Sequence, residues 1–329
     1  MQTSKKSPTS FLGVVCCCTL TTMLTVSAAF ADSTTQNSRI AFVGNQGGSF
    51  QLYTVNPDGS DMVQITNLPP TLFETWLPDF SPDGQRLTFC YGTFDSADNA
   101  FAEIYVINVD GSGLKQLTND GLFDCFPRWS PDGSRIIFGR QAPRTQQLVV
   151  ATMRADGSDK KELSSPLWGI ARAGFTPDSK RILWETQQAG FISVLWIMDA
   201  DGTHQKRLTS APLKAGEVSA PSPDGKHIVF ISNQNTPPEV LNVLFVMDFD
   251  NGKITQITHA VGTSHDVLPN YSPDGTKIVF ASDRTSTDGS LDLFTINADG
   301  SGLTRIATGI TVGGCPDKNC VSPAWGRKP

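Results

Sequence analysis

Phe80-Ser81-Pro82-Asp83-Gly84 carries most of the information about the fold, because four close variants of it follow along the chain. The variants are Trp129-Ser-Pro-Asp-Gly133, Phe175-Thr-Pro-Asp-Ser179, Pro221-Ser-Pro-Asp-Gly225 and Tyr271-Ser-Pro-Asp-Gly275. Successive copies begin 46 to 50 residues apart, a period typical of propellers and other stacked arrays. In each copy, proline fixes φ at the first corner, the aspartate side chain caps the turn, and glycine accepts the positive φ of a hairpin.

Two hairpins follow from each repeat. A basic residue and an apolar strand come directly after the turn, as in Arg86-Leu-Thr-Phe89, and the nearly continuous apolar run is typical of a strand buried on both faces. We expect the basic residue to pair locally with the turn aspartate. A second hairpin then turns at Asp-Gly or Asn-Gly, as at Asp110-Gly111, and its last strand ends in a tail such as Gln116-Leu117-Thr118. Four strands joined in this way form one propeller blade.

The two ends of the repeat region predict the number of blades. Arg39-Ile-Ala-Phe42 matches the second strand of a blade, and the missing first strand is found at the far end as Ser322-Pro-Ala-Trp-Gly326. Five complete units and one shared unit give six blades, and closing the ring removes a free sheet edge. The sequence therefore predicts an all-β fold, a six-bladed β-propeller closed by a C-terminal strand that completes the N-terminal blade.

These repeats resemble those of the TolB-like propeller family, a relative of the WD-type repeats, over nearly all of residues 32–329. The resemblance implies a binding role with a protein partner of the cell envelope. TolB itself has an α/β domain before its propeller, whereas seven residues separate Asp32 from the first strand here, so the docking role of that domain is not carried over. Ser179 in place of glycine and Pro221 in place of an aromatic residue predict looser turns or packing in blades four and five.

Residues 1–31 have the pattern of a signal peptide. Lys5 and Lys6 are followed by an apolar stretch, and Ala29-Phe30-Ala31 offers the small residues that a signal peptidase reads. We expect cleavage after Ala31, giving an exported periplasmic or secreted protein of residues 32–329 without stable membrane insertion. A retained membrane anchor is the weaker alternative, because the stretch is rich in Thr, Ser and Cys.

Charge and cysteine content narrow the function classes. The formal net charge is -6, and -8 without Lys5 and Lys6, which disfavours nucleic acid as a partner because a basic patch is needed to displace counterions. Four cysteines remain after cleavage, and an even number in an oxidising compartment suggests disulfides. We expect Cys315 to pair with Cys320, and Cys90 with Cys125 as a tie between blades two and three.

Aromatic residues at one repeat position predict the core between blades. Phe80, Trp129, Phe175, Tyr271 and Trp325 all lie on a first strand, and we expect each to wedge between neighbouring blades.

The sequence offers little support for catalysis. No Gly-x-Ser-x-Gly nucleophile motif occurs, which disfavours a peptidase, and we expect no catalytic residue, cofactor or metal. Only four histidines are present, and a metal site needs three or four converging ligands. The alternative is an exported carbohydrate-active or small-molecule enzyme, a lyase or hydrolase, with a metal near His265, Asp266 and Asp124.

The leading hypothesis places binding on the face opposite the tight turns, where the longer loops of a rigid scaffold lie. Aromatic residues beside charged ones around a central depression suit a protein, peptide or sugar surface. We expect Asp283 and Arg284, in one of these loops, to form a local ion pair. A purely structural module is a third possibility. The candidate binding residues are Phe73, Glu74, Trp76, Phe123, Asp124, Arg140, Trp168, Arg172, Glu217, His265, Asp266 and Arg284.

Overall fold

The computed structural model divides the chain into two compact units, Met1–Ala31 and Asp32–Pro329, and the second holds every described residue. The structure describes residues 38–44, 49–69, 77–94, 100–143, 145, 147–165, 172–188, 192–208, 215–232, 242–259, 262, 264–286, 290–310 and 323–327. Among these residues no helix has the length and apolar character needed to cross a bilayer.

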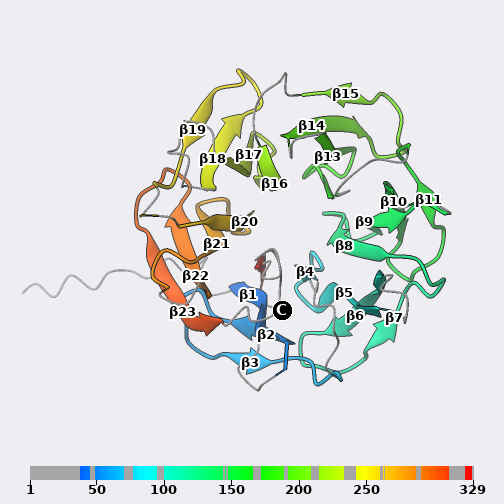
Figure 1. Ribbon diagram of the computed structural model, residues 1–329, viewed down its shortest axis with the longest axis horizontal. Helices are drawn as coiled ribbons and strands as arrows, with labels where there is room; N and C mark the ends of the chain where they lie inside the picture. The colour runs from blue at the N-terminus through cyan, green and yellow to red at the C-terminus, as the bar shows by residue number, and fades with distance from the viewer. Residues whose placement is uncertain are drawn as a thin grey trace, which may run out of the picture. The chain divides into compact units, whose positions relative to one another are not determined.

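The described residues form 24 strands, which make six antiparallel four-stranded sheets arranged around a common centre (Figure 1). The first blade consists of β24 (Ala324–Arg327), β1 (Ser38–Gly44), β2 (Gln51–Val55) and β3 (Val63–Gln64). The second consists of β4 (Asp79–Phe80), β5 (Arg86–Phe94), β6 (Ala100–Asn108) and β7 (Lys115–Gln116). The third consists of β8 (Asp124–Trp129), β9 (Arg135–Gln141), β10 (Leu148–Arg154) and β11 (Lys161–Glu162).

The remaining three blades follow the same order. The fourth consists of β12 (Ala173–Phe175), β13 (Arg181–Gln188), β14 (Ile192–Asp199) and β15 (Lys206–Arg207). The fifth consists of β16 (Ala215–Pro221), β17 (His227–Ser232), β18 (Val243–Asp248) and β19 (Ile254–Gln256). The sixth consists of β20 (Asp266–Tyr271), β21 (Lys277–Ser282), β22 (Leu291–Asn297) and β23 (Thr304–Ile310). A bridge from Ser193 to Ala215 links the fourth and fifth sheets.

The predicted closure by the C-terminal strand is confirmed. β24 pairs antiparallel with β1 in a register that sets Trp325 opposite Ile40, and the Trp325 indole N–H donates a 2.9 Å hydrogen bond to the Ser38 hydroxyl. Because β1 also pairs with β2, the first blade is assembled from the two ends of the folded region.

The propeller has two faces, and the Ser-Pro-Asp-Gly turns and the turns between third and fourth strands lie on the same one. In an antiparallel blade the first and third strands run in the same direction, so the turns that end them lie on one face, which we call the turn-rich face. The opposite face, which holds the connections between blades and between second and third strands, is the loop-rich face. From this topology, each residue near a strand end can be assigned to one of the two faces.

A serine or threonine hydroxyl organises each Ser-Pro-Asp-Gly turn, which the sequence analysis did not foresee. The Ser81 hydroxyl donates to Asp83 Oδ1 at 2.5 Å and accepts from the Arg86 N–H at 2.9 Å, and Ser130, Thr176, Ser222 and Ser272 repeat the arrangement. The expected loosening at Ser179 is wrong for its turn, because Ser179 adopts a φ of 57° and Thr176 keeps the same hydrogen bonds.

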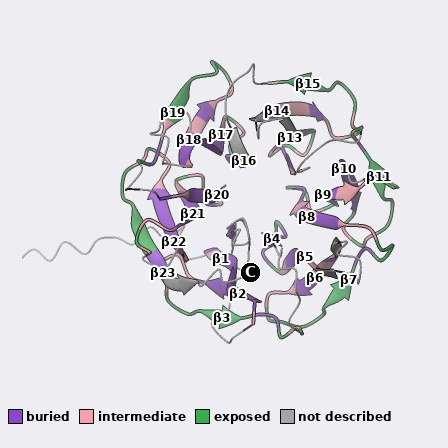
Figure 2. Ribbon diagram, viewed as in Figure 1, coloured by how far each residue is buried: buried purple, intermediate pink, exposed green. Residues whose placement is uncertain are grey.

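The core lies mainly on the first three strands of each blade, and the fourth strands of the first four blades are exposed at the rim, whereas β23 of blade six buries Ile306 and Ala307 (Figure 2). Strand-two aromatic residues stack on strand-three aromatic residues within a blade, with ring centroids 5.5 to 5.8 Å apart. The pairs are Phe42–Tyr53, Phe89–Tyr105, Trp184–Trp196, Phe230–Phe245 and Phe280–Phe294.

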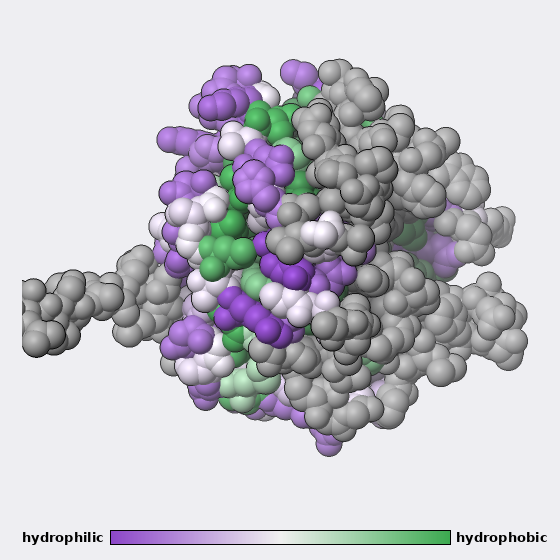
Figure 3. Space-filling view, turned by 60° about the vertical axis from the view of Figure 1, so that its left-hand side comes forward, coloured by the Kyte–Doolittle hydropathy of each residue, from purple (hydrophilic) through white to green (hydrophobic). Residues whose placement is uncertain are grey.

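The first-strand aromatic residues fill the spaces between blades, as their repeat position predicted. Phe80, Trp129, Phe175, Tyr271 and Trp325 are all buried. Trp129 of blade three, for example, packs in one cluster with Ile104 and Leu117 of blade two. Apolar residues left on the surface are scattered, and Figure 3 shows hydrophobic atoms interspersed with hydrophilic ones on the side it presents.

Two of the basic residues that begin second strands form ion pairs with a different partner from the one expected, whereas His227 lies 3.9 Å from Asp224 of its own turn, as expected. Arg39 contacts Asp61 at 2.8 Å and Arg135 contacts Asp159 at 2.9 Å, and both acids lie in third-to-fourth-strand turns rather than in Ser-Pro-Asp-Gly turns. The register places the end of strand three directly beside the start of strand two, which brings these groups together.

A buried carboxylate fastens blade two to blade three. Asp79 Oδ2 accepts a 2.8 Å hydrogen bond from the Trp129 backbone N–H. Burial raises the pKa of Asp79 to about 6, although the nearby Arg128 charge and the Trp129 N–H act in the opposite direction. The folded protein therefore holds a proton at this site over a range in which the unfolded chain has released it.

We expect this proton to make stability depend on pH. Because the folded-state pKa of Asp79 is raised, the stabilisation is present below about pH 4 and is lost as the pH rises to about 6, with a total change of up to about 3 kcal/mol. Asp79→Asn keeps the acceptor for Trp129 and removes the titration. Urea unfolding across this pH window should show a flatter dependence for the variant, and identical slopes would contradict the assignment.

Candidate functional site

Two first strands, β8 and β20, begin with an aspartate on the loop-rich face. The segments Asp124-Cys-Phe-Pro127 and Asp266-Val-Leu-Pro269 share their spacing, and each strand has a shifted register next to its proline. Proline has no N–H to donate to the sheet, so the regular ladder is interrupted there. Phe126 and Leu268 take positive φ values of 62° and 57° at the interruption. The same local distortion therefore sets both carboxylates at the loop-rich face.

Asp266 is fully satisfied by its neighbours. Arg284 Nη2 donates to both carboxylate oxygens at 2.6 Å, and the Thr258 hydroxyl donates to Oδ2 at 2.5 Å. The Arg284 guanidinium also lies 5.4 Å and 5.5 Å from the ring centres of Phe280 and Phe294. Asp266 is 1% exposed, so this is a closed structural clamp that leaves no carboxylate oxygen for a ligand.

The expected pairing of Asp283 with Arg284 is replaced by a different one. Asp283 Oδ1 accepts from the His265 backbone N–H at 2.6 Å, and its Oδ2 lies 2.9 Å from His265 Nδ1. The alternative metal set is not brought together either, because Asp124 begins a strand of blade three, whereas His265 and Asp266 are in blade six.

Asp124 is as deeply buried as Asp266 but less completely bonded. Its Oδ2 accepts from Arg140 Nη1 at 3.2 Å, and its Oδ1 has no hydrogen-bond partner among the described residues. Burial raises the pKa of Asp124 to about 7 in spite of the Arg140 charge, and the acids Asp120 and Glu103 raise it further. A buried acceptor of this kind costs free energy unless a donor, a proton or a ligand reaches it.

Asp124, Asp120, Glu103 and Arg140 together form what we call the Asp124 cluster. Arg140 Nη2 makes a short ion pair with Asp120, which Lys160 also approaches at 3.5 Å. Glu103 Oε1 accepts from the backbone N–H of Asp120 at 3.2 Å, and Glu103 Oε2 is buried without a partner among the described residues. One oxygen from each of the three acids lies within 4.8 Å of the others. Such an all-oxygen donor set suits Ca²⁺, Mg²⁺ or Mn²⁺ rather than zinc.

Aromatic and cationic side chains border the Asp124 cluster. The rings of Phe123 and Phe126 are 6.1 Å apart, and the Arg172 guanidinium of blade four lies 4.9 Å from the Phe126 ring centre. The structure thus joins the predicted residues Phe123, Asp124, Arg140 and Arg172 along one edge of blades three and four. Phe126, Glu103 and Asp120 were not foreseen, although the Asp-x-Phe-Pro spacing marks the position of Phe126.

The other predicted residues divide into two groups. Cys90 and Cys125 are buried and form a disulfide between blades two and three, with Cα atoms 5.1 Å apart. Six predicted residues lie outside the described part of the chain: Phe73, Glu74, Trp76, Trp168, Cys315 and Cys320. The side chain of Glu217 is not described either.

Comparison with known families agrees with this architecture. The family model described as the TolB beta propeller domain matches residues 71–236 and 214–325. The chain belongs to the TolB β-propeller family. TolB from Acinetobacter baumannii has a TM-score of 0.69 at 19% identity, covering 89% of this chain and 67% of that one. A TolB-type structure from Agrobacterium tumefaciens has a TM-score of 0.62 at 19% identity, covering 89% of this chain and 99% of that one.

Curated relatives of this TolB-type propeller include enzymes. Dipeptidyl-peptidase 5 of Porphyromonas endodontalis is 24% identical over 250 residues, which cover 61% of this chain and 36% of the relative. The chain thus spans little more than a third of the length of that peptidase. An oligogalacturonate lyase solved in complex with manganese has a TM-score of 0.51 at 15% identity, covering 84% of this chain and 88% of that one, which shows a shared fold alone.

Proposed function

We propose that residues 32–329 are an exported, non-catalytic β-propeller that binds a protein or peptide of the cell envelope through the loop-rich face. In this proposal residues 1–31 are a signal peptide removed after Ala31, and the protein acts in the periplasm or outside the cell. Membership of the TolB family supports the binding role. The Asp124 cluster is the observation that carries the choice of face.

The chemistry of this face suits a polypeptide partner. The exposed Asp120 carboxylate can accept a hydrogen bond, and the neighbouring half-buried Phe123 and Phe126 offer aromatic surface. Interfaces are enriched in aromatic residues and arginine around a desolvated centre. A partner that presents an N–H or a cation would therefore meet the exposed Asp120 beside these rings, whereas Asp124 itself is 0% exposed.

We expect the double variant Trp76→Ala/Trp168→Ala to capture at least about tenfold less partner, because truncating an aromatic hot spot costs about 2 kcal/mol or more. The measurement is crosslinked pull-down from the native envelope, with the partner identified by mass spectrometry. Met62→Ala/Leu114→Ala is the matched control, since these exposed apolar residues follow turns on the turn-rich face. Equal capture by the tryptophan variant and the wild type, at equal thermal stability, would refute the choice of face.

The second candidate is an exported lyase or hydrolase, and the acid grouping of the Asp124 cluster is the observation that favours it. Glu103, Asp120 and Asp124 would hold a divalent cation there, which would supply Lewis-acid chemistry to a bound substrate. Metal analysis of the purified protein separates the candidates. Stoichiometric calcium, magnesium or manganese that Asp124→Ala loses would favour the enzyme, whereas a metal-free protein that captures a partner would favour the binding propeller.

A further inference from the structure

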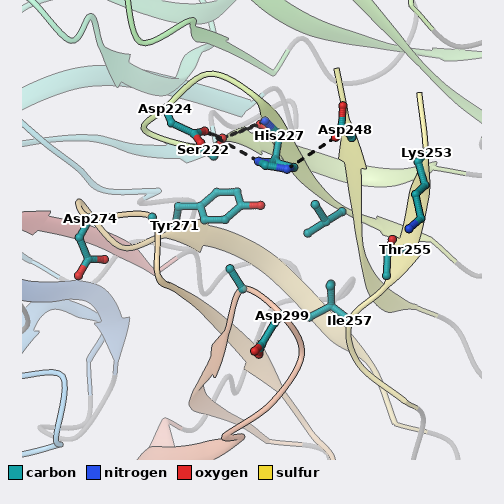
Figure 4. A pocket seen from close by; sticks show the side chains of 13 residues that line it. Ser222, Asp224, His227, Asp248, Lys253, Thr255, Ile257, Tyr271, Asp274 and Asp299 are labelled. Atoms are coloured by element: carbon teal, nitrogen blue, oxygen red, sulfur yellow. Dashed lines mark hydrogen bonds and ion pairs between the residues drawn. The ribbon is translucent and has the colours of Figure 1, made fainter. Parts of the chain in front are cut away.

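A pocket of about 400 Å³ opens on the turn-rich face between blades five and six, away from the Asp124 cluster (Figure 4). Its apolar wall is formed by Val246, Ile257 and Ala298. Its polar side chains come from the turns and strand ends that meet there: Ser222, Asp224, His227, Asp248, Lys253, Thr255, Tyr271, Asp274 and Asp299.

Two substitutions within the repeat explain why this space is open. Between blades two and three, the Arg86 guanidinium lies 4.8 Å from the ring centre of Trp129 and covers it. His227 occupies the repeat position of Arg86, and Tyr271 occupies that of Trp129. Both side chains are shorter or smaller than this pair, so they do not fill the volume that Arg86 and Trp129 fill between blades two and three.

At a third position a lysine stands where two other blades carry a paired aspartate. Asp61 and Asp159 each pair with the basic residue that begins the second strand of their blade. Lys253 occupies the same repeat position in blade five, opposite His227. Among the described residues the Lys253 ammonium has no carboxylate within 4.0 Å, so it is available at the pocket wall.

The Tyr271 hydroxyl is the polar group aimed into this space. Tyr271 is 5% exposed, and Figure 4 shows its hydroxyl directed between His227 and Ile257. Within the described part of the chain this hydroxyl makes no hydrogen bond. Burial and the nearby Asp224 charge raise the pKa of Tyr271, so the group stays protonated and can donate. The ring of Tyr271 is buried while its hydroxyl reaches the pocket, so water or an acceptor atom of a bound molecule can take its hydrogen bond there.

The charge around the pocket selects the class of that molecule. Four carboxylates border it, from Asp224, Asp248, Asp274 and Asp299, against the ammonium of Lys253 and the imidazole of His227, which lies 3.9 Å from Asp224 and 4.0 Å from Asp248. Asp224 is held in place by the Ser222 hydroxyl at 2.5 Å, and Asp299 by the Ser301 hydroxyl at 2.6 Å. These fixed acids set a net negative potential over an apolar wall.

We propose that this pocket binds a small organic cation, with an ammonium or guanidinium group at the acids of the mouth, a short apolar body against Val246 and Ile257, and an acceptor atom at the Tyr271 hydroxyl. This assignment is independent of the partner proposed for the loop-rich face. It uses the interface where His227, Tyr271 and Lys253 stand at positions that arginine, tryptophan and aspartate hold in some other blades.

The test is titration calorimetry of the full mature chain with L-arginine amide as the probe and adipate as an anionic control. We expect saturable binding of the cation, weakened about fivefold or more by Tyr271→Phe, which removes one hydrogen bond and opens no cavity. His227→Arg should abolish binding, because the longer side chain fills the pocket as Arg86 fills its own. Lys253→Ala should tighten binding about threefold by removing a like charge.

His204→Arg is the matched control, since it makes the same substitution at an exposed histidine on the same face. It should bind the probe like the wild type, and all variants should melt as the wild type does. Three results would each overturn the proposal. These are no binding of the cation, stronger binding of adipate than of the cation, and equal binding by the wild type, Tyr271→Phe and His227→Arg.

Discussion

Removing residues 321–329 should abolish the cooperative unfolding transition of the propeller. The deletion takes away β24, and β1 then loses the strand with which it pairs over four register positions, from Ser38 to Ala41. It also removes Trp325, which is 7% exposed and packs in the same cluster as Ile278 and Tyr271 of blade six. The loss leaves a sheet edge unpaired and a large apolar surface in water.

The effect should spread because β24 contacts three blades. A Cβ atom on Gly326 would come within 2.2 Å of the Phe80 ring, so β24 also packs directly against blade two. Trp325→Ala alone should therefore cost about 3–5 kcal/mol, the range for emptying a buried aromatic site. Circular dichroism during thermal melting measures both variants.

A matched control separates the effect of losing the ring closure from that of any change at the C-terminal end. Arg327 is the exposed last residue of β24, and Arg327→Ala should melt like the wild type. If the chain lacking residues 321–329 unfolded at the same temperature and with the same steepness as the intact one, the ring closure described here would be wrong.

The sequence predicted the ring closure, the six blades and the aromatic residues between blades because all three depend on a single periodic pattern. Pro82, Asp83 and Gly84 act within one turn, so local chemistry specifies their structure. Trp325 was assigned to the first blade from its position in the repeat, and the pairing with Ile40 confirms it. Repetition lets one well-understood unit predict the others.

The partners of the charged residues could not be predicted in the same way. Arg284 passes over its neighbour Asp283 to reach Asp266, because the sheet register brings Asp266 and Ser282 together. Arg39 likewise reaches past β2 to Asp61, in the turn between β2 and β3. Such choices depend on the register and on which groups are buried, and neither is visible in the linear spacing of charges.

The pocket between blades five and six was missed for a related reason. His227 was recognised as the start of a strand and Tyr271 as a core residue, each within its own repeat. Their combined effect is a cavity, and it appears only when neighbouring blades are set side by side, as Arg86 and Trp129 show at the equivalent place.

Arg284→Met should destabilise the protein by about 3–5 kcal/mol, because it leaves the Asp266 carboxylate buried without its counter-charge. Asp266 is 1% exposed and both of its oxygens are bonded to Arg284 Nη2, so water cannot replace the guanidinium without opening blade six. Chemical unfolding of the wild type and the variant at pH 7 measures the difference.

The Asp124 cluster supplies the matched comparison. Arg140→Met also removes the cation beside a buried aspartate, but the pKa of Asp124 is raised to about 7, so a proton can neutralise this carboxylate at little cost. The loss there should stay below about 2 kcal/mol and shrink as the pH falls. Asp266→Leu/Arg284→Met, which removes both charges, should recover most of the stability lost by Arg284→Met alone. Equal losses of stability for Arg284→Met and Arg140→Met would contradict this difference between the two sites. They would show that the two carboxylates do not depend on their arginines in the way these distances indicate.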